Sequence, residues 1–186
     1  MAVVYSGYTL YFASPEPLST SDRGWTMVQG RDFIWGCQNG WMAPELLLPQ
    51  HAAKAAFFRQ IGRYRVAGRR FLAYGQPVGL VDHAQIVTEP WATGPACLPV
   101  VLGSTWRAAD RALGVFLVNQ LDTESAIDLA LAPGEYGLEP GPTGYVVQRR
   151  GPDPDGAVET VRAGTVTRTE VLGPTEIRFL EIRRQG

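Results

Sequence analysis

The segment STWRAADRALGVFLVNQLD, from Ser104 to Asp122, is the clearest sign of the fold in this sequence. Two runs rich in apolar and β-branched residues lie on either side of a short polar group at residues 108–111. Runs of this kind around a polar turn are typical of a β-hairpin. Trp106 and Phe116 are the largest side chains of the two runs, so we expect both in a hydrophobic core.

Short apolar or alternating segments continue from this hairpin toward the C-terminus, separated by turn signals. They are Val100–Arg107, Leu113–Asn119, Ala126–Leu129, Tyr145–Gln148, Val158–Arg162 and Glu176–Ile182. Glycine and proline crowd residues 133–156, which we expect to be long connections at one end of the structure. Short strands at this spacing predict an antiparallel β-sandwich.

The sequence before residue 90 follows a different pattern. Val3–Phe12 and Asp32–Trp35 are predicted to be strands, and His51–Leu72 is predicted to be a helix. The apolar face of this helix consists of Ala53, Phe57, Ile61, Tyr64, Gly68 and Phe71, while Arg59, Arg63 and Arg70 lie on the solvated face. Glycine weakens a helix, so we expect Gly68 to mark a close approach to another element.

Composition excludes several classes of function. The 17 basic and 18 acidic residues give a net charge of -1 and form no basic block, which disfavours nucleic acid and membrane surfaces as partners. No apolar run is long enough to span a bilayer, and Met1–Pro17 lacks the features of a signal peptide. The sequence leaves the cellular compartment open.

Metal and cofactor sites are not expected either. Cys37 and Cys97 are the only cysteines and His51 and His83 the only histidines, in no metal-ligand spacing. The two cysteines are either two unrelated buried thiols, which we favour, or one bridge. No GxSxG, GxxxxGK[ST] or HExxH motif occurs, and we predict no cofactor.

Four phrases in this order carry a family resemblance. They are FIWGCQNGWM (residues 33–42), KAAFFRQIGRYR (54–65), FLAYGQPV (71–78) and STWRAADRALGVFLVN (104–119). Together they resemble the C-terminal part of glycoside-hydrolase-like (β/α)₈ barrel proteins with an appended β-sandwich. Within that group, the resemblance is strongest to a poorly characterised branch that is classified as a domain of unknown function.

This resemblance implies an α+β fold: the last strands and helix of an incomplete TIM-type barrel, followed by an antiparallel β-sandwich. Val3–Phe12 and Phe33–Trp35 would be late barrel strands and His51–Leu72 the last outer helix. Residues 1–89 would then be the barrel remnant and residues 90–186 the accessory sandwich.

The resemblance places Trp35, Gln38, Asn39 and Trp41 at the working face, where barrel strands end. Aromatic rings stack on the C–H faces of sugars, and amides exchange hydrogen bonds with sugar hydroxyls, so we expect carbohydrate contact there. Structural roles compete with this interpretation. Either tryptophan could instead pack against a neighbouring element, which we favour for Trp35, and Gln38 and Asn39 are also common turn residues.

Catalysis needs a pair of carboxyl groups, and the sequence supplies no clear pair. Glu16 is the one acid expected at the working face, although a glutamate between two prolines is more often a surface residue. A complete barrel takes about 200–250 residues, so the residues that catalyse the reaction in the family would lie on strands outside this sequence.

The sequence is compatible with two alternative functions. The chain is either a C-terminal fragment or truncated relative of a glycoside-hydrolase-like protein, non-catalytic alone and self-associating through uncovered barrel elements, or a self-contained carbohydrate-binding or protein-interaction module.

Overall fold

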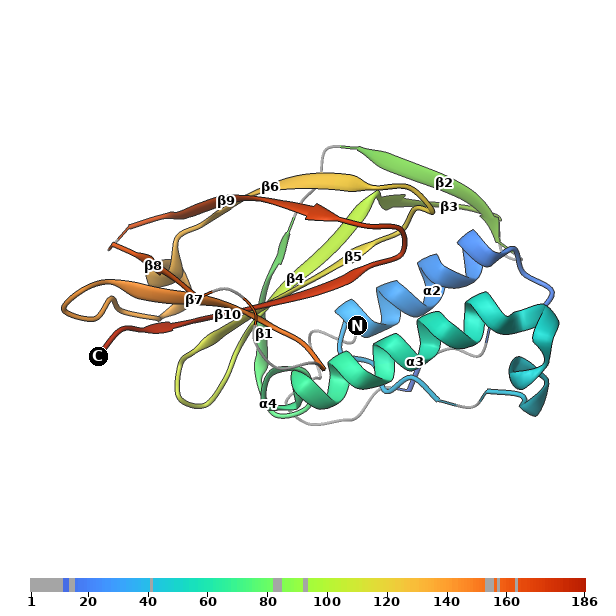
Figure 1. Cartoon of the computed structure of the whole chain (residues 1–186), viewed down its shortest axis with the longest axis horizontal. Helices are drawn as coiled ribbons and strands as arrows, with labels where there is room; N and C mark the ends of the chain where they lie inside the picture. The colour runs from blue at the N-terminus through green and yellow to red at the C-terminus, as the bar shows by residue number, and fades with distance from the viewer. Residues whose placement is uncertain are drawn as a thin grey trace.

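The computed structural model describes residues 12–13, 16–40, 42–81, 85–91, 94–152, 156, 158–162 and 164–186. Helices lie on one side of an antiparallel sheet, and a pair of strands, β6 (Ser125–Leu131) and β9 (Val166–Leu172), lies on the other side (Figure 1). The fold is α+β, as the sequence predicts. No helix among these residues is long and apolar enough to cross a membrane.

Helix α2 (Asp22–Ile34) corrects one sequence prediction. The predicted strand Asp32–Trp35, assigned above to a late barrel strand at Phe33–Trp35, is wrong, since these residues form the last turn of α2 and its C-terminal cap. A short apolar run fits a buried helix as well as a strand, and α2 is buried on most sides. Ser21 begins the helix by accepting a hydrogen bond from the Gly24 backbone N–H at 3.0 Å.

The predicted helix His51–Leu72 is confirmed in two pieces, α3 (Ala52–Ala67) and α4 (Arg69–Leu72). Two short 3₁₀ turns, η1 (Pro44–Leu47) and η2 (Pro49–His51), lead into α3. A Cβ atom on Gly68, between the two pieces, would lie 2.6 Å from the Phe116 ring, so the predicted close approach at this glycine is confirmed.

The predicted hairpin is confirmed as β4 (Val101–Arg107) and β5 (Leu113–Asn119), and Trp106 and Phe116 are buried in it. In the described residues this hairpin belongs to a six-stranded antiparallel sheet with the order β1-β4-β5-β10-β7-β8. The remaining strands of this sheet are β1 (Gln76–Val81), β7 (Tyr145–Arg150), β8 (Val158–Val161) and β10 (Ile177–Arg184).

Two further strand pairs complete the described β-structure. β6 and β9 pair with each other, and β2 (Ile86–Trp91) pairs with β3 (Gly94–Pro99). The sequence prediction missed β1, β2, β3 and β9. Three of these strands contain proline, which argues against a strand when the sequence is read alone.

Hydrophobic side chains fill both sides of the six-stranded sheet, because successive residues of a strand point to opposite faces. The cluster on the helix side includes Phe33, Phe57, Ile61, Phe71, Trp106, Phe116 and Phe179. The cluster on the other side includes Val115, Leu117, Leu180, Ile127, Leu129 and Leu172. The helices and the sheet therefore share one core.

This shared core also corrects the idea that the apolar face of α3 is uncovered. Phe57, Ile61 and Phe71 are only 4%, 1% and 1% exposed, because they pack in one cluster with residues of α2 and of the sheet. The helical part of the reason given for self-association is therefore wrong. Of the predicted strand Val3–Phe12, all residues except Phe12 lie outside the described residues, and self-association itself stays a prediction. The boundary between residues 89 and 90 stays a prediction, although β1 precedes it and pairs with β4.

Candidate functional site

A short parallel contact defines the region in which the sequence predicts a binding face. Phe12 and Gln38 form a parallel bridge, and the backbone N–H of Ala13 donates to the Gln38 carbonyl at 3.0 Å. Helix α2 lies between these two extended segments in the sequence, as in the strand-helix-strand unit of a barrel. Residues that follow Ala13 and Gln38 therefore lie at the carboxyl end of the pair, where barrel enzymes place their sites.

Arg65 of α3 fixes the start of the second segment. Its guanidinium donates to the carbonyls of Cys37 at 2.7 Å and Gly36 at 3.1 Å, and burial lowers the pKa of this guanidinium from its ordinary value. Burial also raises the pKa of the Cys37 thiol, and the nearby Asp32 adds to this effect. Cys37 and Cys97 are both free, so the alternative of a bridge is excluded. Cys37 is buried as predicted, but the prediction of a buried thiol is wrong for Cys97, which is exposed.

Glu16 lies in the loop between the first extended segment and α2. Its carboxylate accepts a hydrogen bond from the Thr20 hydroxyl at 2.6 Å, and the residue is half-buried. This contact stabilises the approach to α2. A catalytic role for Glu16 stays a prediction.

Trp35 lies at the other end of the region. It caps the C-terminus of α2 before the extended segment begins, and its side chain is 39% exposed. The Arg31 guanidinium lies over its ring, 5.1 Å from the centroid. Sugar contact by Trp35 stays a prediction, and the ring lies under the Arg31 guanidinium at the C-terminal end of α2.

Asn39 is paired with a residue that sequence reasoning missed. Its Nδ2 donates to Oε1 of Gln29 at 3.0 Å, while Asn39 Oδ1 and Gln29 Nε2 are buried without a hydrogen-bond partner among the described residues. Because both atoms are buried, this contact holds Asn39 against α2. Gln38 is exposed, and Trp41 lies outside the described residues.

The described carboxylates that precede residue 90 are largely engaged elsewhere. Asp22 pairs with Lys54 at 3.2 Å, Asp32 with Arg31 at 2.8 Å, and Glu89 with Arg23 at 3.2 Å. Glu45 is exposed in η1. The ion pairs of Asp22, Asp32 and Glu89 give these three carboxylates a structural role. No cluster of three or more potential metal ligands occurs in the described part of the chain.

Comparison with known proteins gives a fold but no family. No protein-family model and no curated protein matches the chain. An α-amylase from Geobacillus thermoleovorans, solved in complex with acarbose, aligns with 89% of this chain at 10% sequence identity and a TM-score of 0.51. The α-galactosidase I from Mortierella vinacea aligns with 90% of it at 9% identity and a TM-score of 0.44.

The fold resembles that of the aligned part of the amylase chain. Of these two similarities, only that to the amylase exceeds a TM-score of 0.5. The aligned region covers 34% of the amylase chain and 37% of the galactosidase chain, so this chain spans about a third of their length.

Proposed function

We propose that this chain corresponds to the C-terminal part of a glycoside-hydrolase-like protein, comprising the last barrel elements and the accessory sandwich. The observation that carries the proposal is the parallel contact between Phe12 and Gln38 across α2, next to an antiparallel sandwich, in a chain that aligns with a third of an α-amylase. Its role is to contribute one edge of a carbohydrate site.

The chain by itself is non-catalytic under this proposal. Glycoside hydrolysis usually needs one protonated and one ionised carboxyl group on either side of the scissile bond. Glu16 is the one described acid at the carboxyl end of the parallel pair, and it is hydrogen-bonded to Thr20. Asp22, Asp32 and Glu89 are held in ion pairs.

A self-contained carbohydrate-binding or interaction module is the second candidate. The observation that favours it is the shared core, in which Phe57 and Phe71 of the helices pack with Phe116 of the sheet. Elements that bury their apolar faces against each other form one folding unit. Both candidates place carbohydrate contact at the end of the parallel pair, at Gln38, Asn39 and Trp41.

The test combines an activity assay with a binding assay on the purified chain. We expect no hydrolysis of a panel of aryl glycosides, and a change in tryptophan fluorescence when oligosaccharides are added. Trp41→Ala should weaken that change without a large loss of melting temperature. Hydrolysis that is abolished by Glu16→Gln would overturn the non-catalytic proposal.

The binding assay tests the proposed contact face independently of the activity assay. If no oligosaccharide changes the fluorescence, or if Trp41→Ala lowers the melting temperature strongly and leaves binding unchanged, the proposed contact face is wrong and Trp41 is a packing residue.

A further inference from the structure

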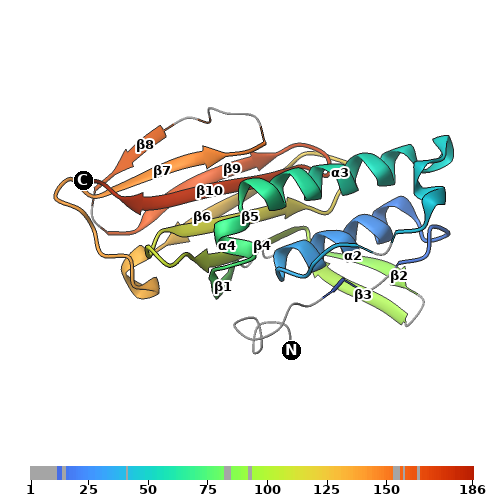
Figure 2. The same ribbon diagram turned by 90° about the horizontal axis from the view of Figure 1, so that it is seen from below.

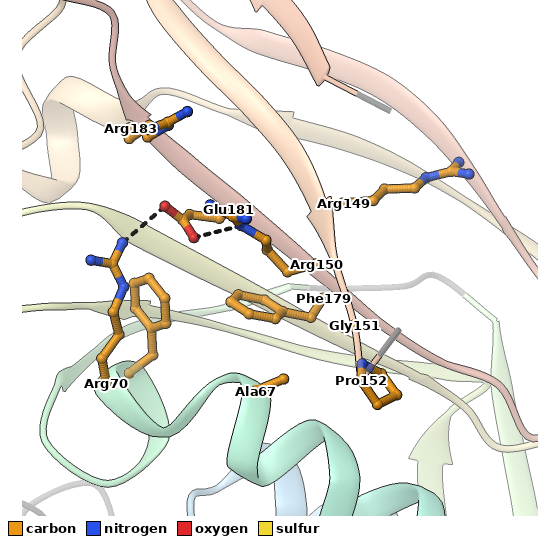
Figure 3. Close-up of a pocket in the computed structure, with 10 residues that line it drawn as sticks. Ala67, Arg70, Arg149, Arg150, Gly151, Pro152, Phe179, Glu181 and Arg183 are labelled. Atoms are coloured by element: carbon orange, nitrogen blue, oxygen red, sulfur yellow. Dashed lines mark hydrogen bonds and ion pairs between the residues drawn. The ribbon is translucent and has the colours of Figure 1, made fainter. Parts of the chain in front are cut away.

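A cavity of about 620 Å³ opens on the helix-facing side of the sheet, where the helices end. Its lining comes from the last turns of α3 and α4, from β7 and β10, and from the residues that follow β7. Figure 2 shows that the start of β7 and the end of β10 extend beyond the helical layer. Figure 3 shows Ala67 and Pro152 on one side of the cavity and Glu181, Arg150 and Arg183 on the other, with Arg70 reaching from the helix toward Glu181.

Glu181 of β10 is bound by two arginines from different elements. Arg70 Nη2 donates to its Oε1 at 3.0 Å, and Arg150 Nε donates to its Oε2 at 3.0 Å (Figure 3). The other end of the Arg70 guanidinium donates to Asp110 at 2.8 Å. Both oxygens of Glu181 therefore already have a cationic partner.

Positive charge is left over at the rim of this cavity. Arg150 uses only Nε in the hydrogen bonds made by the described residues, so both of its Nη groups are available, and its side chain is 40% exposed. Arg183 is exposed and has no hydrogen bond or ion pair within the described ranges. It lies on the same face of β10 as Glu181, two residues away.

These free groups have a clear chemical preference. A guanidinium presents parallel N–H donors that match the two oxygens of a carboxylate, and such charge-assisted bonds are stronger than bonds between neutral groups. A ligand with only neutral hydroxyl groups would leave these positive charges without a counter-charge. Beside them, Ala67, Phe179 and Pro152 supply an apolar wall that suits the C–H face of a ring.

We propose that this cavity binds the carboxylate of an acidic saccharide, such as a uronic acid residue, through Arg150 and Arg183. The proposal rests on the carbohydrate role proposed above and adds a substrate class to it. Arg70 and Glu181 act as positioning residues, because Glu181 orients the Arg150 guanidinium so that its Nη groups remain free for the ligand.

The experiment is calorimetric titration of the purified chain with a galacturonate trisaccharide. Maltotriose serves as the neutral probe and inorganic phosphate as the simple anion. We expect the galacturonate trisaccharide to bind, and its affinity to fall as salt is raised, because partly exposed charges are screened. Arg183→Gln should weaken binding roughly tenfold or more, as expected for the loss of a charge-assisted hydrogen bond.

Arg184→Gln is the matched control. Arg184 is the exposed neighbour of Arg183 on β10, and adjacent strand residues project to opposite faces, so the same charge is removed away from the cavity. It should leave the affinity unchanged. Arg183 has no described partner to lose, so its variant should fold, and equal melting temperatures for the two variants would verify this.

Each of the following results would overturn the proposal. Equal weakening by Arg184→Gln would mean diffuse attraction rather than a site, equal affinity for phosphate would mean a general anion site, and binding of maltotriose alone would exclude the carboxylate. This last result would leave the proposed carbohydrate role intact. If none of the three probes binds, this inference fails, while the fluorescence and aryl glycoside tests still judge the proposed function.

Discussion

Phe116→Ala tests whether the helices and the sheet depend on one aromatic core. Phe116 is 0% exposed and stacks on Phe179, with ring centroids 4.4 Å apart and an interplanar angle of 11°. Phe33 and Phe71 meet it edge-on at 5.8 Å and 6.3 Å. The ring is thus enclosed by one residue from the sheet and two from the helices.

The cost of removing this ring should be high. Truncation of a buried phenylalanine to alanine costs about 3–5 kcal/mol, and the cost is largest where the surrounding groups cannot collapse into the cavity. Rings on three sides and the Gly68 backbone on another hold this cavity open. Each aromatic pair contributes about 0.5–1.5 kcal/mol beyond the buried area. We therefore expect a loss of about 4–5 kcal/mol in the free energy of unfolding.

Urea denaturation followed by circular dichroism measures this loss. Val171→Ala is a suitable control, because Val171 is 45% exposed on β9 and its truncation should change stability by less than about 0.5 kcal/mol. A loss below about 1 kcal/mol for Phe116→Ala, with an unchanged dependence on urea, would refute the shared aromatic core.

Four further predictions concern packing, thiol reactivity and titration. Gly68→Ala should lower the free energy of unfolding by about 1–3 kcal/mol, because its Cβ would lie 2.6 Å from Phe116. Gly62→Ala, with nothing within 4 Å of its Cβ, should be neutral or stabilising, and equal urea midpoints for the two variants would contradict this. Gln120→Leu should raise the melting temperature, since neither amide atom of this 1% exposed side chain has a partner among the described residues; a lower value would reveal an unseen partner. At neutral pH a thiol reagent should label exposed Cys97 rapidly and buried Cys37 only on unfolding. Because burial raises the pKa of Cys37 above 9.0, the unfolded chain loses this proton first, so stability should fall as pH rises past 9.0, and Cys37→Ala should reduce that fall.

Much of the secondary structure could be predicted from the sequence because its signals are local. The polar turn at residues 108–111 separates two apolar runs, and β4 and β5 form there. The apolar period from Phe57 to Phe71 predicts a helix, and Gly68 marks its tight contact correctly. These features depend on residues within a few positions of one another.

Where local signals were ambiguous, only the tertiary structure decided. The run Phe33-Ile34-Trp35 fits either a strand or a helix, and burial of α2 between α3 and the sheet selects the helix. β2 and β3 contain prolines that argue against strands, yet the two segments pair with each other. In both cases packing outweighs weak local preference.

In the candidate sites, too, the sequence indicates residue types, whereas the tertiary structure determines which residues meet. Residue types at 35–41 indicated carbohydrate contact, but the sequence could not show that Asn39 faces Gln29 or that Trp35 caps a helix. The sequence by itself determined which segments alternate or turn, since side-chain period and turn chemistry act over a few residues. Only the tertiary structure decided that Arg70 and Arg150 meet at Glu181, because such contacts depend on how the helices and strands pack.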